Sequence, residues 1–363
     1  GGPGASGMSL RLRDDLAGSH PYGAPQLDVP VRLNVNENPF APSEALVAAI
    51  GEAVRTAARD LNRYPDRDAV ALRAELAQYI RQESGAEVTS DQVWAANGSN
   101  EVMHHLLLAF GGPGRTLVTF APSYSMYAEY CRDTFTQFHA VPRTEDFRVD
   151  RAAVDAALAL HPDIVVVCSP NNPTGTVLDE DVLDYVLAAH NGLVIVDEAY
   201  AEFRAPGTPS ATLRVADHPG LVVTRTMSKA FSCAGLRLGY AVASAQVVDG
   251  CRLVRLPYHL SSVTQAVARA ALGFAGELLG HVDLLRTERE GMREWLQSAG
   301  YEVAPSGANF LMFGRFEDRH AVWQQLVDRG VLIRQTGPDG WLRASIGTPQ
   351  ENEALRRALT ERT

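Results

Sequence analysis

Short and almost entirely apolar runs recur along the first 250 residues. They read TLVTFA, DIVVVC, GLVIVD, LVVTRT and LGYAVA, at residues 116–121, 163–168, 192–197, 221–226 and 238–243. Runs of this length without alternating polar positions are typical of strands that are buried on both faces. Stretches with helical spacing lie between or beside them, at 43–59, 66–82, 100–110, 123–132, 150–160 and 179–190. The alternation predicts an α/β fold with a mostly parallel sheet between helices.

The pattern changes after about residue 250. Long helices are predicted within 261–300, followed by the strands ANFLMF, VLIR and WLRASI. We therefore expect a large domain at 46–250 and a smaller α+β domain at 251–363, the latter completed by an N-terminal arm at 8–45. The leading residues 1–7, GGPGASG, are interpreted as an expression scar.

Composition and charge exclude several classes of function. The net charge is -10 and the arginines are scattered, so no basic stripe for nucleic acid is expected. No apolar run reaches membrane-spanning length and no secretory leader precedes the chain, which favours a soluble, cytoplasmic protein with no membrane partner. The four cysteines form no CxxC pair and are expected to be free thiols. No metal site is predicted, because the histidines lack ligand spacing.

Lys229 is the only lysine in the chain, since the 33 basic residues comprise 32 arginines and this one. Arginine carries a positive charge equally well but does not lose its proton in proteins. A lysine can become a neutral nucleophile when it is desolvated or lies near other cations. The single lysine is explained either by such a chemical role or by chance loss of all other lysines. The neighbouring residues decide between these two explanations.

Polar residues follow consecutive predicted strands at the edge where parallel sheets bind ligands. Asn171 and Asn172 follow the strand at 163–168. Asp197 ends the strand at 192–197 and is followed by Tyr200, and Lys229 follows the strand at 221–226. Each group alone has a structural explanation, as a rigid turn or a helix cap. Their occurrence together favours one functional site.

These residue types fit the requirements of pyridoxal phosphate. Its aldehyde needs an amine, Lys229, and its pyridinium nitrogen needs a carboxylate, Asp197. Asn172 and Tyr200 suit the ring oxygen, and Tyr124 can stack on the ring. Hydroxyls, helix N-terminal N–H groups and a cation suit the phosphate. The candidates for these phosphate contacts are Gly98, Ser99, Asn100, Thr226, Ser228 and Arg237.

From about residue 10 onward, the chain resembles the fold-type-I pyridoxal-phosphate aminotransferases, and among them the histidinol-phosphate aminotransferases. The motifs that carry the resemblance are PYGAP, LNVNENP, RYPDRD, AANGSNE, PSYSMY, SPNNPTG, VDEAY, TMSKAF, GLRLGY, ANFLMF and LRASIG. The resemblance implies a sheet of the seven-stranded type, and it implies the same cofactor contacts. Asn100 stands where an aspartate is common, with little expected effect because that contact is largely through the backbone.

The resemblance also implies substrate contacts and a partner. Arg343 matches the position that binds the amino-acid carboxylate, and Arg334 and Tyr22 match positions used for the substrate phosphate. Asn36, within LNVNENP, is predicted with them. Tyr64 matches a tyrosine that reaches the cofactor phosphate of the neighbouring subunit, so a homodimer is expected.

The implied reaction is a transamination between L-histidinol phosphate and 2-oxoglutarate. An aromatic or broad-range aminotransferase on the same scaffold is the nearest alternative. A decarboxylase of the same fold needs a differently placed carboxylate. A cofactor-binding regulator is disfavoured because no DNA-binding module precedes the aminotransferase region.

Overall fold

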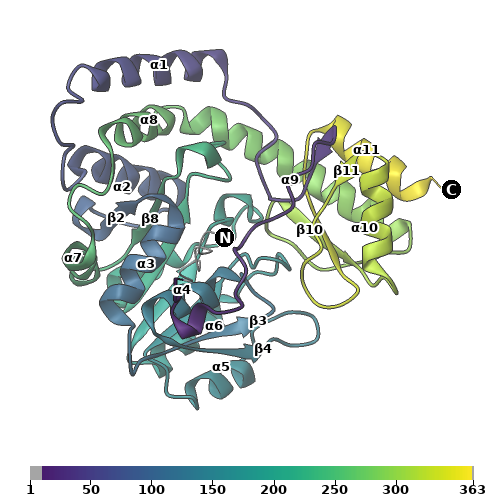
Figure 1. Ribbon diagram of the computed structural model, residues 1–363, viewed down its shortest axis with the longest axis horizontal. Coiled ribbons are helices and arrows are strands. Elements are labelled where there is room, and N and C mark those ends of the chain that lie inside the picture. Colours follow the sequence, from purple (N-terminus) through teal and green to yellow (C-terminus); the bar gives the residue numbers. More distant parts are fainter. Residues whose placement is uncertain (1–9, 362–363) are drawn as a thin grey trace, which may run out of the picture.

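A seven-stranded sheet organises the larger part of the computed structural model, which describes residues 10–361 (Figure 1). The expression scar expected at residues 1–7 lies outside these residues. The strand order is β2-β8-β7-β6-β5-β3-β4. The strands are β2 (Val93–Ala96), β3 (Thr116–Ala121), β4 (Gln137–Pro142), β5 (Ile164–Cys168), β6 (Leu193–Asp197), β7 (Leu221–Thr226) and β8 (Gly239–Val242).

The prediction of a mostly parallel sheet is confirmed. Strands β7, β6, β5, β3 and β4 pair in parallel, whereas β8 is antiparallel to both of its neighbours, β7 and β2. The apolar runs predicted five of these strands within a residue or two. Strands β2 and β4 were not predicted.

Apolar side chains on the two faces of the sheet enter two separate cores. Along β5, Val165 and Val167 pack in one core, and Ile164 and Val166 pack in the other. Helices α2, α5, α6 and α8 cover the first face, and α3, α4 and α7 cover the second. These helices are α2 (Val70–Ser84), α3 (Gly98–Phe110), α4 (Met126–Thr134), α5 (Arg151–Leu158), α6 (Glu180–Ala189), α7 (Ala245–Val254) and α8 (Ser262–Leu272).

The helix expected at 43–59 is present as α1 (Glu44–Ala58), which packs on α8. Its N-cap, Ser43, accepts a hydrogen bond from the Leu46 backbone N–H, which satisfies one of the free donors of the first turn. Short 3-10 helices complete the larger part. They are η1 (Asp14–Leu16), η2 (Ser90–Gln92), η3 (Ala201–Phe203), η4 (Ala211–Asp217) and η5 (Ala234–Leu236).

A smaller antiparallel sheet of order β12-β10-β9 lies beside the large one, with the yellow C-terminal helices around it (Figure 1). Its neighbour is a two-stranded parallel sheet in which the N-terminal strand β1 pairs with β11. The elements here are β1 (Val31–Arg32), α9 (Ala275–Ser298), β9 (Glu302–Val303), β10 (Phe310–Gly314), α10 (Arg319–Asp328), β11 (Val331–Leu332), β12 (Leu342–Ser345) and α11 (Pro349–Thr360).

Two further features concern the cysteines and the hydropathy of the helices. All four cysteines are buried and free, as their spacing predicts. Among residues 10–361, no helix combines the length and the apolar character needed to cross a membrane.

Candidate active site

A cavity of about 930 Å³ opens at the carboxyl ends of the parallel strands. Residues that end or follow β5, β6 and β7 reach it, together with the first turn of α3 and residues next to β11 and within β12. This is the edge at which open parallel sheets bind ligands. The predicted site residues that line the cavity are Tyr22, Asn36, Ser99, Asn100, Tyr124, Asn172, Asp197, Tyr200, Thr226, Ser228, Lys229, Arg237, Arg334 and Arg343.

The Lys229 amine lies inside the cavity, three residues beyond the end of β7. Its Nζ donates a hydrogen bond to the carbonyl oxygen of Val35 (3.1 Å) and lies 5.9 Å from the centre of the Tyr200 ring. Burial, together with the neighbouring Arg343 cation, lowers the pKa of Lys229 from 10.5 to about 8. A lysine with such a pKa is neutral often enough to act as a nucleophile or a base near neutral pH.

Asp197, the last residue of β6, presents a buried carboxylate to the cavity. Its Oδ2 accepts a hydrogen bond from the Tyr127 hydroxyl (2.6 Å), and its Oδ1 accepts one from the Ala199 N–H (3.1 Å). Burial raises the pKa of Asp197, and these two hydrogen bonds oppose that effect. Because both donors are neutral, the carboxylate is suited to a cationic ligand group such as a protonated ring nitrogen.

Tyr200 and Asn172 lie on the side of the cavity nearest the small sheet. The Tyr200 hydroxyl accepts a hydrogen bond from Asn36 Nδ2 (3.0 Å), and Asn172 Oδ1 accepts one from Arg343 Nη1 (2.5 Å). Burial raises the pKa of Tyr200 to about 12, so its hydroxyl keeps its proton and remains a donor. Both side chains can therefore donate to a ligand oxygen.

The start of α3 and the loop after β7 form an end of the cavity suited to an anion. The N–H of Ser228 donates to Thr226 Oγ1 (3.0 Å), which holds both residues at this end. Gly98 lies behind Arg237, because a Cβ at position 98 would lie 2.9 Å from Arg237 Nη2. The glycine therefore lets a guanidinium approach the N-terminus of α3, where free N–H groups also favour negative charge.

Arg343 supplies a buried guanidinium from β12. Its Nη2 donates to the Asn34 carbonyl (2.8 Å), whereas its Nε is buried without a hydrogen-bond partner. Burial lowers the pKa of Arg343 to about 10. Arg334 is bridged to Arg343 by two backbone hydrogen bonds of 3.0 Å, and both side chains line the cavity. Two cations thus enter the cavity from the small-sheet side.

Two predicted site residues, Gly98 and Tyr64, do not line this cavity. Gly98 lies behind Arg237, whereas Tyr64 is a surface residue. The Tyr64 side chain is 80% exposed and stacks on Tyr258, with ring centres 4.5 Å apart. An exposed position is compatible with a contact to a second subunit.

Several contributors were not predicted from the sequence. Tyr127 holds Asp197, and Asn38 Nδ2 donates to the backbone carbonyl of Lys229 (3.1 Å). Residues 23–28 and Glu37 also line the cavity. Tyr127 lies within α4 at the helical spacing that is typical of core residues. The sequence therefore gives no signal that distinguishes Tyr127 from an ordinary core residue.

Comparison with known proteins places the chain among enzymes that transfer amino groups. Residues 29–359 match the family model described as Aminotransferase class I and II. The histidinol-phosphate aminotransferase of Thermobifida fusca is 56% identical over 355 residues, which cover 98% of this chain and 96% of that protein.

Solved structures show the same fold. A putative histidinol-phosphate aminotransferase from Erwinia carotovora atroseptica has a TM-score of 0.82 at 27% identity, over 93% of this chain and 97% of that one. The histidinol-phosphate aminotransferase of Sinorhizobium meliloti, in complex with pyridoxal-5'-phosphate, has a TM-score of 0.79 at 23% identity, over 91% and 90% of the two chains. At this last identity the likeness shows the fold alone.

Proposed function

This chain belongs to the class I and II aminotransferases, and we propose that it transfers an amino group between L-histidinol phosphate and 2-oxoglutarate. In the biosynthetic direction it uses imidazole-acetol phosphate and L-glutamate, a step of histidine biosynthesis. The substrate assignment rests on relatives that are more than half identical over nearly their whole length.

The donors around the cavity fit pyridoxal 5'-phosphate, the cofactor of this reaction. When bound, the cofactor takes up the amino group and delocalises the electrons of the C–H bond that is broken. The residues proposed to hold it are Lys229 at the aldehyde, Asp197 at the ring nitrogen, Asn172 and Tyr200 at the ring oxygen, Tyr124 at the ring face, and Gly98, Ser99, Asn100, Thr226, Ser228 and Arg237 at the phosphate.

Lys229 and the substrate-binding side chains carry out proton transfer and hold the substrates. The neutral Lys229 Nζ can accept a proton and return it, as a general base and acid must. We assign the carboxylate of glutamate to Arg343 and the phosphate of histidinol phosphate to Arg334 and Tyr22. Asn36 orients Tyr200 through the hydrogen bond between them.

The observation that carries the proposal is the pair of guanidiniums at the small-sheet end of the cavity. Arg343 is buried with an unpaired Nε, and Arg334 lies next to it through the β-bridge. A buried cation without a counter-ion is unfavourable unless a ligand supplies one. Arginine binds carboxylate and phosphate equally well, which suits a site that must accept both substrates in turn.

A homodimer and a cytoplasmic location complete the proposal. The exposed Tyr64 supports the dimer, because its aromatic ring is available to a neighbouring subunit.

Amino-donor half-reactions test the function. The holoenzyme is mixed with histidinol phosphate, phenylalanine or leucine, and the change in cofactor absorbance is followed. Histidinol phosphate should react with a kcat/KM about 10- to 150-fold above the other two, because only its phosphate can satisfy Arg334. Equal values for histidinol phosphate and phenylalanine would instead favour the aromatic or broad-range aminotransferase.

A further inference from the structure

Four hydrogen bonds and two short stretches of backbone form a closed ring, which joins the cofactor side of the cavity to the small sheet. Asn36 Nδ2 donates to the Tyr200 hydroxyl (3.0 Å), and Asn309 Nδ2 donates to the Asn36 carbonyl (2.9 Å). Ala308, the residue before Asn309, accepts from Arg289 Nη1 (3.0 Å), which also donates to the Phe203 carbonyl (2.7 Å). Phe203 lies in η3, three residues after Tyr200, so the ring returns to its start.

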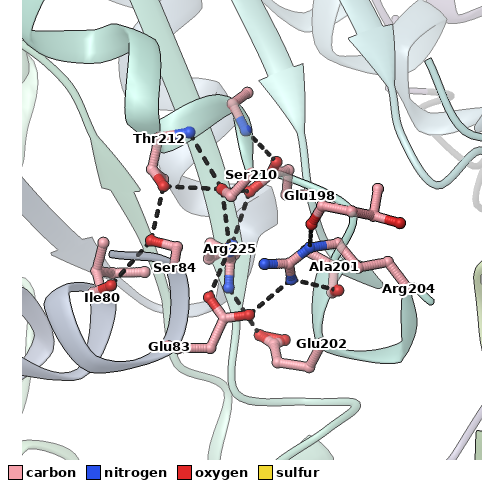
Figure 2. Close-up of polar contacts among 12 residues, drawn as sticks. Ile80, Glu83, Ser84, Glu198, Ala201, Glu202, Arg204, Ser210, Thr212 and Arg225 are labelled. Atoms are coloured by element: carbon pink, nitrogen blue, oxygen red, sulfur yellow. Dashed lines mark hydrogen bonds and ion pairs between the residues drawn. The ribbon is translucent and has the colours of Figure 1, made fainter. Parts of the chain in front are cut away.

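The short helix η3 is a rigid part of this ring, because buried ion pairs fix it to the large sheet (Figure 2). Arg225, near the end of β7, is completely buried and pairs with Glu202 (3.3 Å) and with Glu198 (2.9 Å). Arg204, just after η3, pairs with Glu83 of α2 (2.6 Å), which also pairs with Arg225 (3.1 Å). A shift of η3 would break several charge-assisted hydrogen bonds.

Phe310 is the residue through which the ring reaches the site. It begins β10 directly after Asn309. Its ring meets the Tyr200 ring edge-on with ring centres 5.1 Å apart. The Arg343 guanidinium carbon lies over the Phe310 ring, 5.3 Å from the ring centre. Strand β10 also pairs directly with β12, which carries Arg343. The position of β10 therefore sets both the Tyr200 environment and the place of the Arg343 cation.

We propose that Arg289 is a positioning residue that sets the place of Arg343 relative to Tyr200. It is the member of the ring that connects η3, fixed to the large sheet, with the start of β10. Its guanidinium is buried and serves two backbone carbonyls, with Glu290 at the surface as its carboxylate partner (3.1 Å). Burying a guanidinium costs desolvation free energy. A role in holding η3 at a fixed distance from the start of β10 explains why the cation is placed there.

The test compares Arg289→Met with Arg293→Met. Arg293 lies one turn further along α9 and pairs with the same Glu290 (2.8 Å), but has no contact with the ring, so it is a matched control. In Arg289→Met, the KM for glutamate should rise about tenfold or more. The Kd of the cofactor-free protein for pyridoxal phosphate should change less than about threefold, because Asp197 and Lys229 keep their own contacts. Arg293→Met should leave both values unchanged.

The inference rests on the proposed function, because the test measures transamination. The inference and the proposed substrate can nevertheless fail separately. If histidinol phosphate does not react with the wild type, the proposed substrate is wrong, whereas the comparison of variants with glutamate still stands.

Two further variants keep the test decisive if Arg289→Met does not fold. Asn309→Ala opens the ring at another link and should raise the KM for glutamate by a similar factor, and the double variant should lose less than the two losses combined. Arg289→Lys retains a donor and should show a smaller rise than Arg289→Met. A KM within about twofold of wild type in folded Asn309→Ala and Arg289→Met, or in Asn309→Ala alone if Arg289→Met is unfolded, would overturn the proposal. A rise in the cofactor Kd equal to the rise in KM would overturn it as well.

Discussion

A single lysine in a chain with 32 arginines is the residue-scale feature from which the site follows. Its environment explains why arginine cannot replace it. Burial and the nearby Arg343 cation lower the pKa of Lys229 to about 8, which makes a neutral amine available. An arginine in the same place would stay charged.

Attachment of the cofactor to Lys229 should therefore follow the titration of a weakly basic amine. Cofactor-free protein is mixed with pyridoxal phosphate at different pH values, reduced with borohydride after a short time, and digested for peptide mapping. Labelling of the Lys229 peptide should increase with pH and reach half of its maximum near pH 8, because only the neutral amine attacks the aldehyde.

A midpoint near the ordinary lysine value of 10.5 would contradict the desolvated environment. Substantial turnover by Lys229→Ala would contradict the assignment of Lys229 itself.

Arg334 and Arg343 should be separable by substrate. Loss of a charge-assisted hydrogen bond removes roughly 1.5–3 kcal/mol, or about 10- to 150-fold in kcat/KM. Arg334→Ala should impose this loss on histidinol phosphate and affect phenylalanine much less. Arg343→Ala should affect every amino acid with an α-carboxylate and largely spare histidinol phosphate. Steady-state kinetics with histidinol phosphate, phenylalanine and glutamate measure both patterns.

Equal losses for histidinol phosphate and phenylalanine in Arg334→Ala would contradict the phosphate assignment. Glutamate is expected to lose activity in both variants, because its second carboxylate can use the same guanidinium as the phosphate.

The sequence predicted those site residues whose chemistry is distinctive or whose motif is specific. Lys229, Asp197 and Asn172 follow buried strands, where parallel topology brings them together. Tyr127 and Phe310 were missed because each acts by contact with another functional residue, Asp197 and Tyr200, which lie 70 and 110 positions away in the chain. Such contacts are set by the fold and leave no local pattern.

At the scale of elements, the ends of β6 and β7 are fixed from behind by the buried ion pairs around Arg225. Three carboxylates and two guanidiniums meet there, from Glu83, Glu198, Glu202, Arg204 and Arg225. Glu202 Oε2 is buried without a hydrogen-bond partner. Charges balance if Glu202 carries a proton, and burial does raise the pKa of Glu202 to about 7.

Glu202→Gln should therefore change how stability depends on pH. The folded-state pKa of Glu202 lies above the ordinary value of 4.5, so folding takes up a proton between pH 4.5 and about 7. Across this window the wild type loses stability relative to Glu202→Gln as the pH rises, and at pH 8 the variant should have the higher Tm. Thermal unfolding of both proteins from pH 5 to pH 8 measures the difference.

Glu198→Gln is the matched control. Glu198 accepts hydrogen bonds from Arg225 (2.9 Å), Ser210 (2.7 Å) and the Ala211 N–H (2.8 Å), so its charge is fully used. Its amide variant should lose roughly 1.5–3 kcal/mol at pH 8. A lower Tm for Glu202→Gln than for wild type at pH 8 would contradict the raised pKa of Glu202.

Element prediction succeeded where burial on both faces produced long apolar runs, as in β5 and β6. Strand β2 is short and leads almost at once into α3, so it did not stand out as a separate apolar run. Strand β4 is an edge strand whose sequence, QFHAVP, mixes polar and apolar positions because little of it is buried. The antiparallel direction of β8 depends on the path of the connection over residues 227–238, which an apolar run does not encode.

At the scale of the whole molecule, two neighbouring segments expose large apolar side chains. Leu253 is 87% exposed and Leu256 is 76% exposed, and the stacked pair of Tyr258 and Tyr64 joins this segment to the one that carries Leu61. Exposed apolar surface of this kind is typical of a protein–protein contact. It supports the proposed homodimer in which Tyr64 serves the neighbouring subunit.

Mixing two inactive variants tests this sharing of sites. In a dimer of Lys229→Ala with Tyr64→Phe, one site has lost both residues, and the other combines an intact Lys229 with an intact Tyr64 from the neighbour. After random exchange of equal amounts, half of the dimers are hybrids with one intact site, so about a quarter of wild-type activity should return. Tyr64→Phe must first be shown to be strongly impaired alone. Lys229→Ala mixed with Asp197→Asn is the control and should stay inactive, because both residues belong to the same subunit's cavity and no hybrid site contains both. Proven exchange without recovery in the Tyr64 mixture would mean that each subunit completes its own site.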